Sequence, residues 1–143
     1  MDLKRVGAVG WSFGGYFSAM AVLRKPEIFR CAVIGAPVVT WENYDTYYTE
    51  RYLGLPSENE EGYRLSNVLT YAADLRQPVL LIHGLTDDNV YVQHSMQLAD
   101  AWFNAGKTFT FVPLLGTHMV SEPVLRLRRQ ARIMEFFDGV LKK

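Results

Sequence analysis

Cysteine is scarce in this sequence. The single cysteine, Cys31, has no partner for an internal disulfide, so nothing indicates an oxidising compartment. Cys31 lies in an apolar run, which favours a buried structural thiol over a reactive one. No signal peptide and no apolar run long enough to span a membrane is visible in the sequence. These absences favour a cytoplasmic protein and give no indication of membrane binding.

An excess of charge of either sign is absent as well. The 15 Lys and Arg residues balance the 15 Asp and Glu residues, so nothing in the total charge points to nucleic acid or an anionic membrane as a partner. One basic cluster is expected to be the solvated face of a helix rather than a nucleic-acid site: Arg126, Arg128, Arg129 and Arg132. With 143 residues, 49% of them apolar, and no repeat, the chain suits one globular domain over residues 1–143.

The sequence is organised around a glycine-rich turn between an apolar segment and a helical pattern. Gly10, Ser12 and Gly14 match the G-x-S-x-G nucleophile elbow, in which a sharp strand-to-helix turn exposes a serine hydroxyl. A Cβ at either flanking glycine is expected to clash in so tight a turn. The helix N-terminus that follows favours developing negative charge. A purely structural Gly-Ser turn has the same pattern, so a catalytic site needs a base and an acid from elsewhere in the chain.

Strand and helix patterns alternate along the chain. Apolar segments predict strands at residues 5–9, 31–35, 79–84 and 108–114. Helical spacing predicts helices at residues 14–24, 65–75 and 93–105, and a long final helix with Ser121 as its N-cap. Residues 56–62 are expected to form a surface loop, whereas the aromatic residues 40–55 fit either a packed helix or a ligand-facing segment. The alternation predicts an α/β fold with a parallel sheet whose first strand lies at an open edge.

Three of the predicted strands are followed by reactive side chains. Ser12 follows the first strand, Asp87 and Asp88 follow the third, and His118 follows the fourth. Functional residues of open parallel sheets gather at the carboxyl ends of the strands, and the order Ser, Asp, His is that of an α/β-hydrolase triad. In such a triad a histidine takes the serine proton, and a carboxylate orients the imidazole. The conjunction of order and position favours a serine hydrolase.

The remaining histidines are assigned no catalytic role. His83 lies inside the third predicted strand, too early to reach Ser12, and His94 begins a helix. Both are expected to be structural or solvated. A pair of aspartates after a strand is by itself most often a turn or a helix cap.

Several segments resemble one family of serine peptidases. Residues 10–16 (GWSFGGY) and 83–90 (HGLTDDNV) look like motifs in the C-terminal catalytic domain of the prolyl oligopeptidase family, as do residues 36–41, 44–45 and 48–56. The aromatic segment is most similar to the dipeptidyl peptidase IV branch. The resemblance covers essentially the whole chain. It implies the C-terminal half of an α/β-hydrolase fold, with about four mainly parallel strands flanked by helices.

The resemblance also implies roles for individual residues. Ser12 would be the nucleophile, His118 the general base and Asp87 the orienting acid, with Asp88 secondary. The backbone N–H of Phe13 would be one oxyanion-hole donor. A proline-selective pocket would be lined by Val38, Trp41, Tyr44, Tyr48 and Val90, and Asn89 would bind a substrate carbonyl. Peptides would be cleaved after proline or a small residue, without metal or organic cofactor.

Departures from the family pattern leave alternatives open. The resemblance implies a β-propeller, the first half of the sheet and a second, tyrosine oxyanion donor, none of which this chain contains. Acidic residues that anchor a peptide N-terminus would also be missing, and residues 114–119 lack the acidic residues and glycine common around the family histidine. One alternative is a related esterase. Another is a catalytically incompetent fragment that acts only as a folded or self-associating module. Whatever the function, the exposed edge of the first strand is expected to drive homo-oligomer formation.

Overall fold

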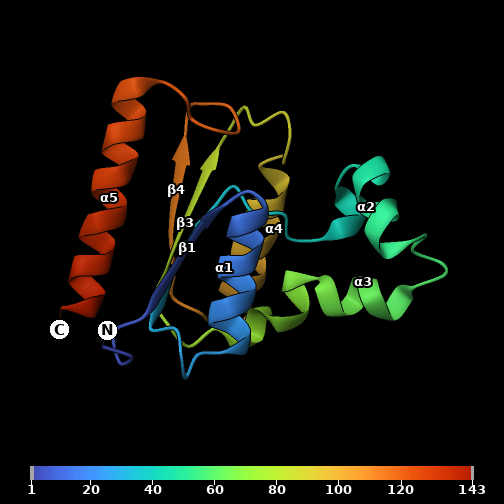
Figure 1. Cartoon of the computed structure of the whole chain (residues 1–143), viewed down its shortest axis with the longest axis horizontal. Helices are drawn as coiled ribbons and strands as arrows, with labels where there is room; N and C mark the ends of the chain where they lie inside the picture. Colours follow the sequence, from blue (N-terminus) through green and yellow to red (C-terminus); the bar gives the residue numbers. More distant parts are fainter. Residues whose placement is uncertain (1, 143) are drawn as a thin grey trace.

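A parallel four-stranded sheet forms the centre of the computed structural model, which describes residues 2–142 (Figure 1). The strands are β1 (Gly7–Trp11), β2 (Cys31–Gly35), β3 (Val79–Gly84) and β4 (Thr110–Leu114), in the spatial order β1-β2-β3-β4. Every neighbouring pair is parallel. The predicted α/β class is therefore confirmed, with strands within two residues of the predicted bounds.

Helices cover both faces of the sheet. One layer contains α1 (Phe13–Arg24), α4 (Gln93–Asn104) and the 3₁₀ helix η2 (Val68–Asp74), and α5 (Pro123–Leu141) lies on the other side (Figure 1). Side chains alternate along the buried strands: Ile34 and Leu81 pack in the first layer, and Val33 and Leu80 pack in the α5 layer. β2 and β3 are buried along their whole length, as expected of parallel strands covered on both faces.

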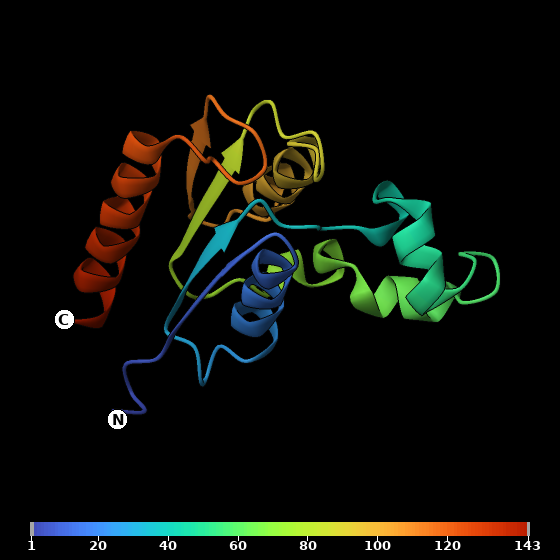
Figure 2. The same ribbon diagram turned by 45° about the horizontal axis from the view of Figure 1, so that its top comes forward.

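The aromatic segment forms a lobe between β2 and β3. It contains the 3₁₀ helix η1 (Trp41–Asn43), α2 (Thr46–Leu53) and α3 (Glu60–Ser66), and Figure 2 shows α2 and α3 extending away from the sheet. The predicted loop at residues 56–62 is too long, because Asn59 caps α3 by accepting from Gly62 N at 3.1 Å. The predicted helix at residues 65–75 is in fact the end of α3 followed by η2, separated at the extended Asn67.

Glu122, not Ser121, caps α5. Its carboxylate accepts hydrogen bonds from the backbone N–H groups of Val124 and Leu125, at 3.3 and 2.7 Å. Pro123 occupies the first turn, where its missing N–H costs no hydrogen bond. The prediction of Ser121 was wrong because the Glu122 carboxylate, one residue later, offers two acceptor oxygens, one for each of these N–H groups.

β1 lies at an edge of the sheet, as predicted. It pairs with β2 on one side, and Val9 in its middle is 58% exposed.

Cys31 on β2 is fully buried, and burial raises the pKa of its thiol to about 11, which suits the predicted structural role. Within residues 2–142, no helix has the length and apolar character that a membrane crossing requires.

Candidate active site

The turn between β1 and α1 holds Ser12 in a strained conformation. Its φ of 59° and ψ of −122° are unusual for any residue other than glycine, and its hydroxyl does not cap the helix that follows. The Ser12 N–H instead donates to Gly35 O at 2.9 Å, which fixes the turn to the end of β2. This geometry places the hydroxyl at the N-terminus of α1, as in a nucleophile elbow.

Close backbone packing around the elbow requires glycine at two positions. A Cβ at Gly10 would overlap the backbone of Gly14, and a Cβ at Gly15 would overlap the carbonyl of Gly35. A Cβ at Gly14 would meet nothing within 4 Å. The predicted clash at both flanking glycines is therefore correct for Gly10 and wrong for Gly14, because the second tight approach falls on Gly15.

Asp87 is buried in the loop after β3. Its Oδ1 accepts from the backbone N–H groups of Asn89 and Val90, at 3.0 and 2.9 Å, and its Oδ2 lies 2.7 Å from Nδ1 of His118. The adjacent Asp88 is exposed to solvent. Only the first aspartate of the pair is thus placed to orient an imidazole.

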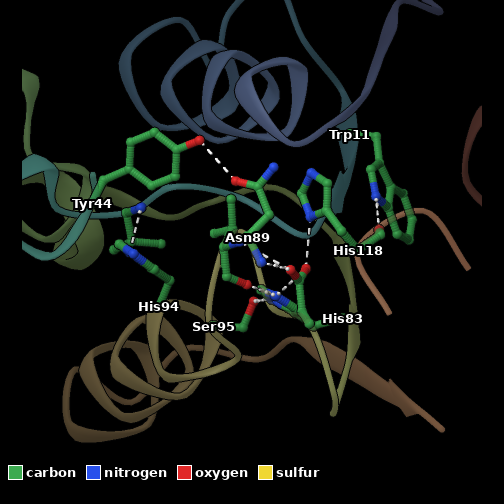
Figure 3. Close-up of polar contacts among 10 residues, drawn as sticks. Trp11, Tyr44, His83, Asn89, His94, Ser95 and His118 are labelled. Carbon is green, nitrogen blue, oxygen red and sulfur yellow. Dashed lines mark hydrogen bonds and ion pairs between the residues drawn. The ribbon is translucent and has the colours of Figure 1, made fainter. Parts of the chain in front are cut away.

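His118 reaches Asp87 because the loops after β3 and β4 lie against each other. Leu85 N donates to Leu114 O at 2.7 Å, and Thr86 N donates to Gly116 O at 3.1 Å. With Nδ1–H donating to the carboxylate, Nε2 is left as an acceptor (Figure 3). Among residues 2–142 no hydrogen bond joins Ser12 to His118. Such contacts often tighten only when substrate binds.

His83 belongs to the same network, which sequence reasoning missed. Its Nε2 lies 2.8 Å from Val90 O and 3.1 Å from Asp87 Oδ2, and its Nδ1 lies 2.6 Å from Ser95 Oγ (Figure 3). Because Val90 O can only accept, Nε2 carries the proton and Nδ1 accepts from the Ser95 hydroxyl. Burial lowers the pKa of His83, which favours this neutral form. The one feature of the sequence that could have indicated this contact is that His83 lies four residues before Asp87, at the end of the same strand.

His94 is a structural histidine, as expected. Its Nδ1 accepts a hydrogen bond from the backbone N–H of Val39 at 3.1 Å, inside the protein. Burial lowers the pKa of His94 and so favours the neutral ring that this contact requires.

The predicted pocket residues Val38, Trp41, Tyr44, Tyr48 and Val90 lie together, three of them in the aromatic lobe and the two valines beside it. The Trp41 ring centroid is 5.9 Å from that of Tyr44 and 6.0 Å from that of Tyr48. Val38 and Val90 are buried in one apolar cluster with Trp41. Trp41 and Tyr48 also line a cavity of about 530 Å³. Four further aromatic residues, not among the predicted pocket residues, line the same cavity: Phe13, Tyr16, Phe17 and Tyr52.

Asn89 joins this aromatic group to the Asp87 loop. The Tyr44 hydroxyl donates to Asn89 Oδ1 at 2.8 Å (Figure 3). Burial and the nearby Asp45 carboxylate raise the pKa of Tyr44, so its phenol remains a donor. The Asn89 amide N–H₂ is then available for another acceptor.

Within the described chain, no three His, Cys, Asp or Glu side chains form a group that could hold a metal ion.

Comparison with known proteins decides the family. A model of the prolyl oligopeptidase family matches residues 1–143. The chain belongs to the prolyl oligopeptidase family. Dipeptidyl peptidase 8 of Mus musculus is 47% identical over 112 residues, a match that covers 76% of this chain and 13% of the relative. Dipeptidyl peptidase 4 of Bos taurus is 45% identical over 112 residues, covering 76% of this chain and 15% of the relative.

Solved structures agree with this assignment. The crystal structure of Porphyromonas gingivalis dipeptidyl peptidase 4 superposes with a TM-score of 0.94 at 33% identity, covering 99% of this chain and 20% of that protein. These matches confirm the predicted resemblance to the dipeptidyl peptidase IV branch of the family. The chain spans a fifth or less of the length of these relatives.

Proposed function

We propose that this chain carries the catalytic residues of a serine peptidase, with Ser12 as nucleophile, His118 as general base and Asp87 as the orienting acid. The 2.7 Å contact between Asp87 and His118, on loops that meet at the strand ends, is the observation that carries the proposal. The strained elbow supplies the nucleophile at the same end of the sheet. Family membership supports the reaction class.

The proposed reaction proceeds through an acyl-enzyme. Ser12 Oγ attacks the scissile carbonyl carbon while His118 Nε2 takes the hydroxyl proton and later gives it to the leaving amine. In the second half, His118 Nε2 takes a proton from water as the water oxygen attacks the acyl carbon, and returns it to Ser12 Oγ as the ester C–O bond breaks and the acid product leaves. Phe13 begins α1, so its N–H has no partner within the helix and would stabilise the oxyanion. Asp87 remains a carboxylate and stabilises the imidazolium.

The aromatic lobe supports a preference for proline or a small residue before the scissile bond. Flat rings such as Trp41, Tyr44 and Tyr48 bury a pyrrolidine ring and exclude larger side chains. Asn89, held by Tyr44, would donate its free amide N–H to a substrate carbonyl. Hydrolysis of peptide p-nitroanilides should be faster with proline or alanine at the cleavage site than with leucine or phenylalanine. Equal rates would contradict the pocket assignment.

Labelling with a fluorophosphonate probe tests the nucleophile. The wild-type chain should be labelled, Ser12→Ala should lose the label, and the exposed Ser121→Ala should keep it. A folded wild-type chain that stays unlabelled, or a Ser12→Ala chain that labels equally, would contradict the proposal.

A further inference from the structure

Trp11, the residue directly before Ser12, reaches the loop of His118. Its indole Nε1–H donates to the backbone carbonyl of His118 at 2.6 Å, joining positions 107 residues apart (Figure 3). The indole ring is itself fixed, because it lies so close to Gly35 that a Cβ there would overlap it. The elbow and the loop of the general base are therefore connected directly.

Arg129 of α5 contacts both the Trp11 ring and the same loop. Its guanidinium carbon lies 4.3 Å from the centroid of the Trp11 ring, within the range of a cation–π contact. Its Nη1 also donates to the backbone carbonyl of Met119 at 3.0 Å. The expectation that the basic cluster is simply a solvated face is thus wrong for Arg129, which is half-buried, whereas Arg126, Arg128 and Arg132 are exposed.

The backbone at this point is strained. Val120 has a φ of 46°, a left-handed conformation that a β-branched residue rarely adopts. Its side chain is buried, and its N–H donates to Thr117 O at 3.2 Å, so a tight turn encloses His118. Loss of the contacts to the two successive carbonyls would allow the turn to relax and His118 to move.

We propose that Trp11 and Arg129 are positioning residues that hold the backbone of His118 and Met119, so that the imidazole stays between Asp87 and Ser12. This inference rests on the proposed serine peptidase function. Neither side chain contacts the reacting atoms. Displacement of a catalytic group by about 1 Å can cost about a hundredfold in rate, which makes the restraint a determinant of activity.

Phosphonylation rates test the proposal. Trp11→Phe and Arg129→Met should each be labelled about tenfold or more slowly than wild type, since each removes a hydrogen bond to the loop. Arg129→Lys retains a cation and a donor and should recover part of the rate. Arg128→Met, on an exposed position next in sequence, is the matched control and should label at the wild-type rate. Wild-type rates in all the variants would overturn the proposal.

The tautomer of the His118 ring gives a readout that needs no activity and that general destabilisation would not move. Nitrogen-15 NMR in mildly alkaline buffer, assigned with His118→Gln, should show the Nδ1–H form alone in wild type and a mixture in Arg129→Met. An unchanged tautomer in Arg129→Met would overturn the inference. If wild type is not labelled at all, the peptidase proposal fails, and this NMR comparison still decides whether the restraint exists.

Discussion

Asp87 is the residue on which the polar contacts of the site converge. Its two oxygens accept from two backbone N–H groups and from the rings of His83 and His118. A carboxylate with four donors has one available rotamer, so the direction in which it presents Oδ2 to His118 is fixed. His83, oriented in turn by Ser95, supports Asp87 from the side away from the solvent.

The neutral state of two buried histidines makes stability depend on pH. Burial lowers the pKa values of His83 and His94 in the folded chain, so near pH 6 the unfolded chain binds more protons. The free energy of unfolding should therefore fall as the pH decreases from about 7.5 through about 6.5 towards the lower folded pKa values. Urea unfolding at a series of pH values measures this slope.

A substitution at His94 isolates its share of the effect. His94→Asn keeps an oxygen acceptor for the Val39 N–H but cannot titrate, so its unfolding free energy should depend less on pH than that of wild type. A slope equal to the wild-type slope, or a wild-type chain that becomes more stable in acid, would contradict this interpretation.

At the scale of elements, the junction of β1, α1 and β2 is where backbone packing is tightest. Gly15 on α1 lies against the carbonyl end of β2, whereas Gly14 faces open space. Gly15→Ala should lower the free energy of unfolding by roughly 1–3 kcal/mol, because a Cβ there overlaps the Gly35 carbonyl. Gly14→Ala should raise it by up to about 1 kcal/mol through helix propensity. Denaturant unfolding of both variants provides the comparison, and equal effects would contradict the packing.

Strands and long helices were predictable from local pattern, whereas caps and short helices were not. The continuous apolar run of β3 and the spacing in α1 and α4 specify those elements by themselves. The start of α3 depends on the side-chain cap by Asn59, and that of α5 on the carboxylate of Glu122. Such contacts depend on rotamers that hydrophobic periodicity does not encode.

The three proposed catalytic residues were predictable from their order along the chain. Ser12, Asp87 and His118 each follow a strand, so parallel topology alone gathers them at one edge of the sheet. The supporting contacts were not predictable, because Trp11 and His118 are 107 residues apart in the sequence. Nor does the sequence pattern indicate that Arg129, on α5, hydrogen-bonds to the loop of His118. The catalytic roles and the implied β-propeller and further strands remain predictions.

At the scale of the whole molecule, the open edge of β1 has consequences for assembly. Within residues 2–142 the strand pairs with β2 alone, and Val9 at its centre is an exposed apolar residue. We expect this chain to self-associate through that edge, and Val9→Lys to weaken the association because charge on an edge strand opposes pairing. Sedimentation velocity over a range of concentrations tests this, and a monomer throughout would contradict it.

The central claim is that Asp87, through His118, activates Ser12, and the adjacent aspartates allow a direct test. The rate of fluorophosphonate labelling, with the label mapped to its peptide, should be compared for wild type, Asp87→Asn and Asp88→Asn. The account predicts a wild-type label on Ser12, a fall of about a thousandfold or more in Asp87→Asn, and a rate within about twofold of wild type in Asp88→Asn. Equal rates in the two folded variants, or a label outside residues 10–14, would contradict it.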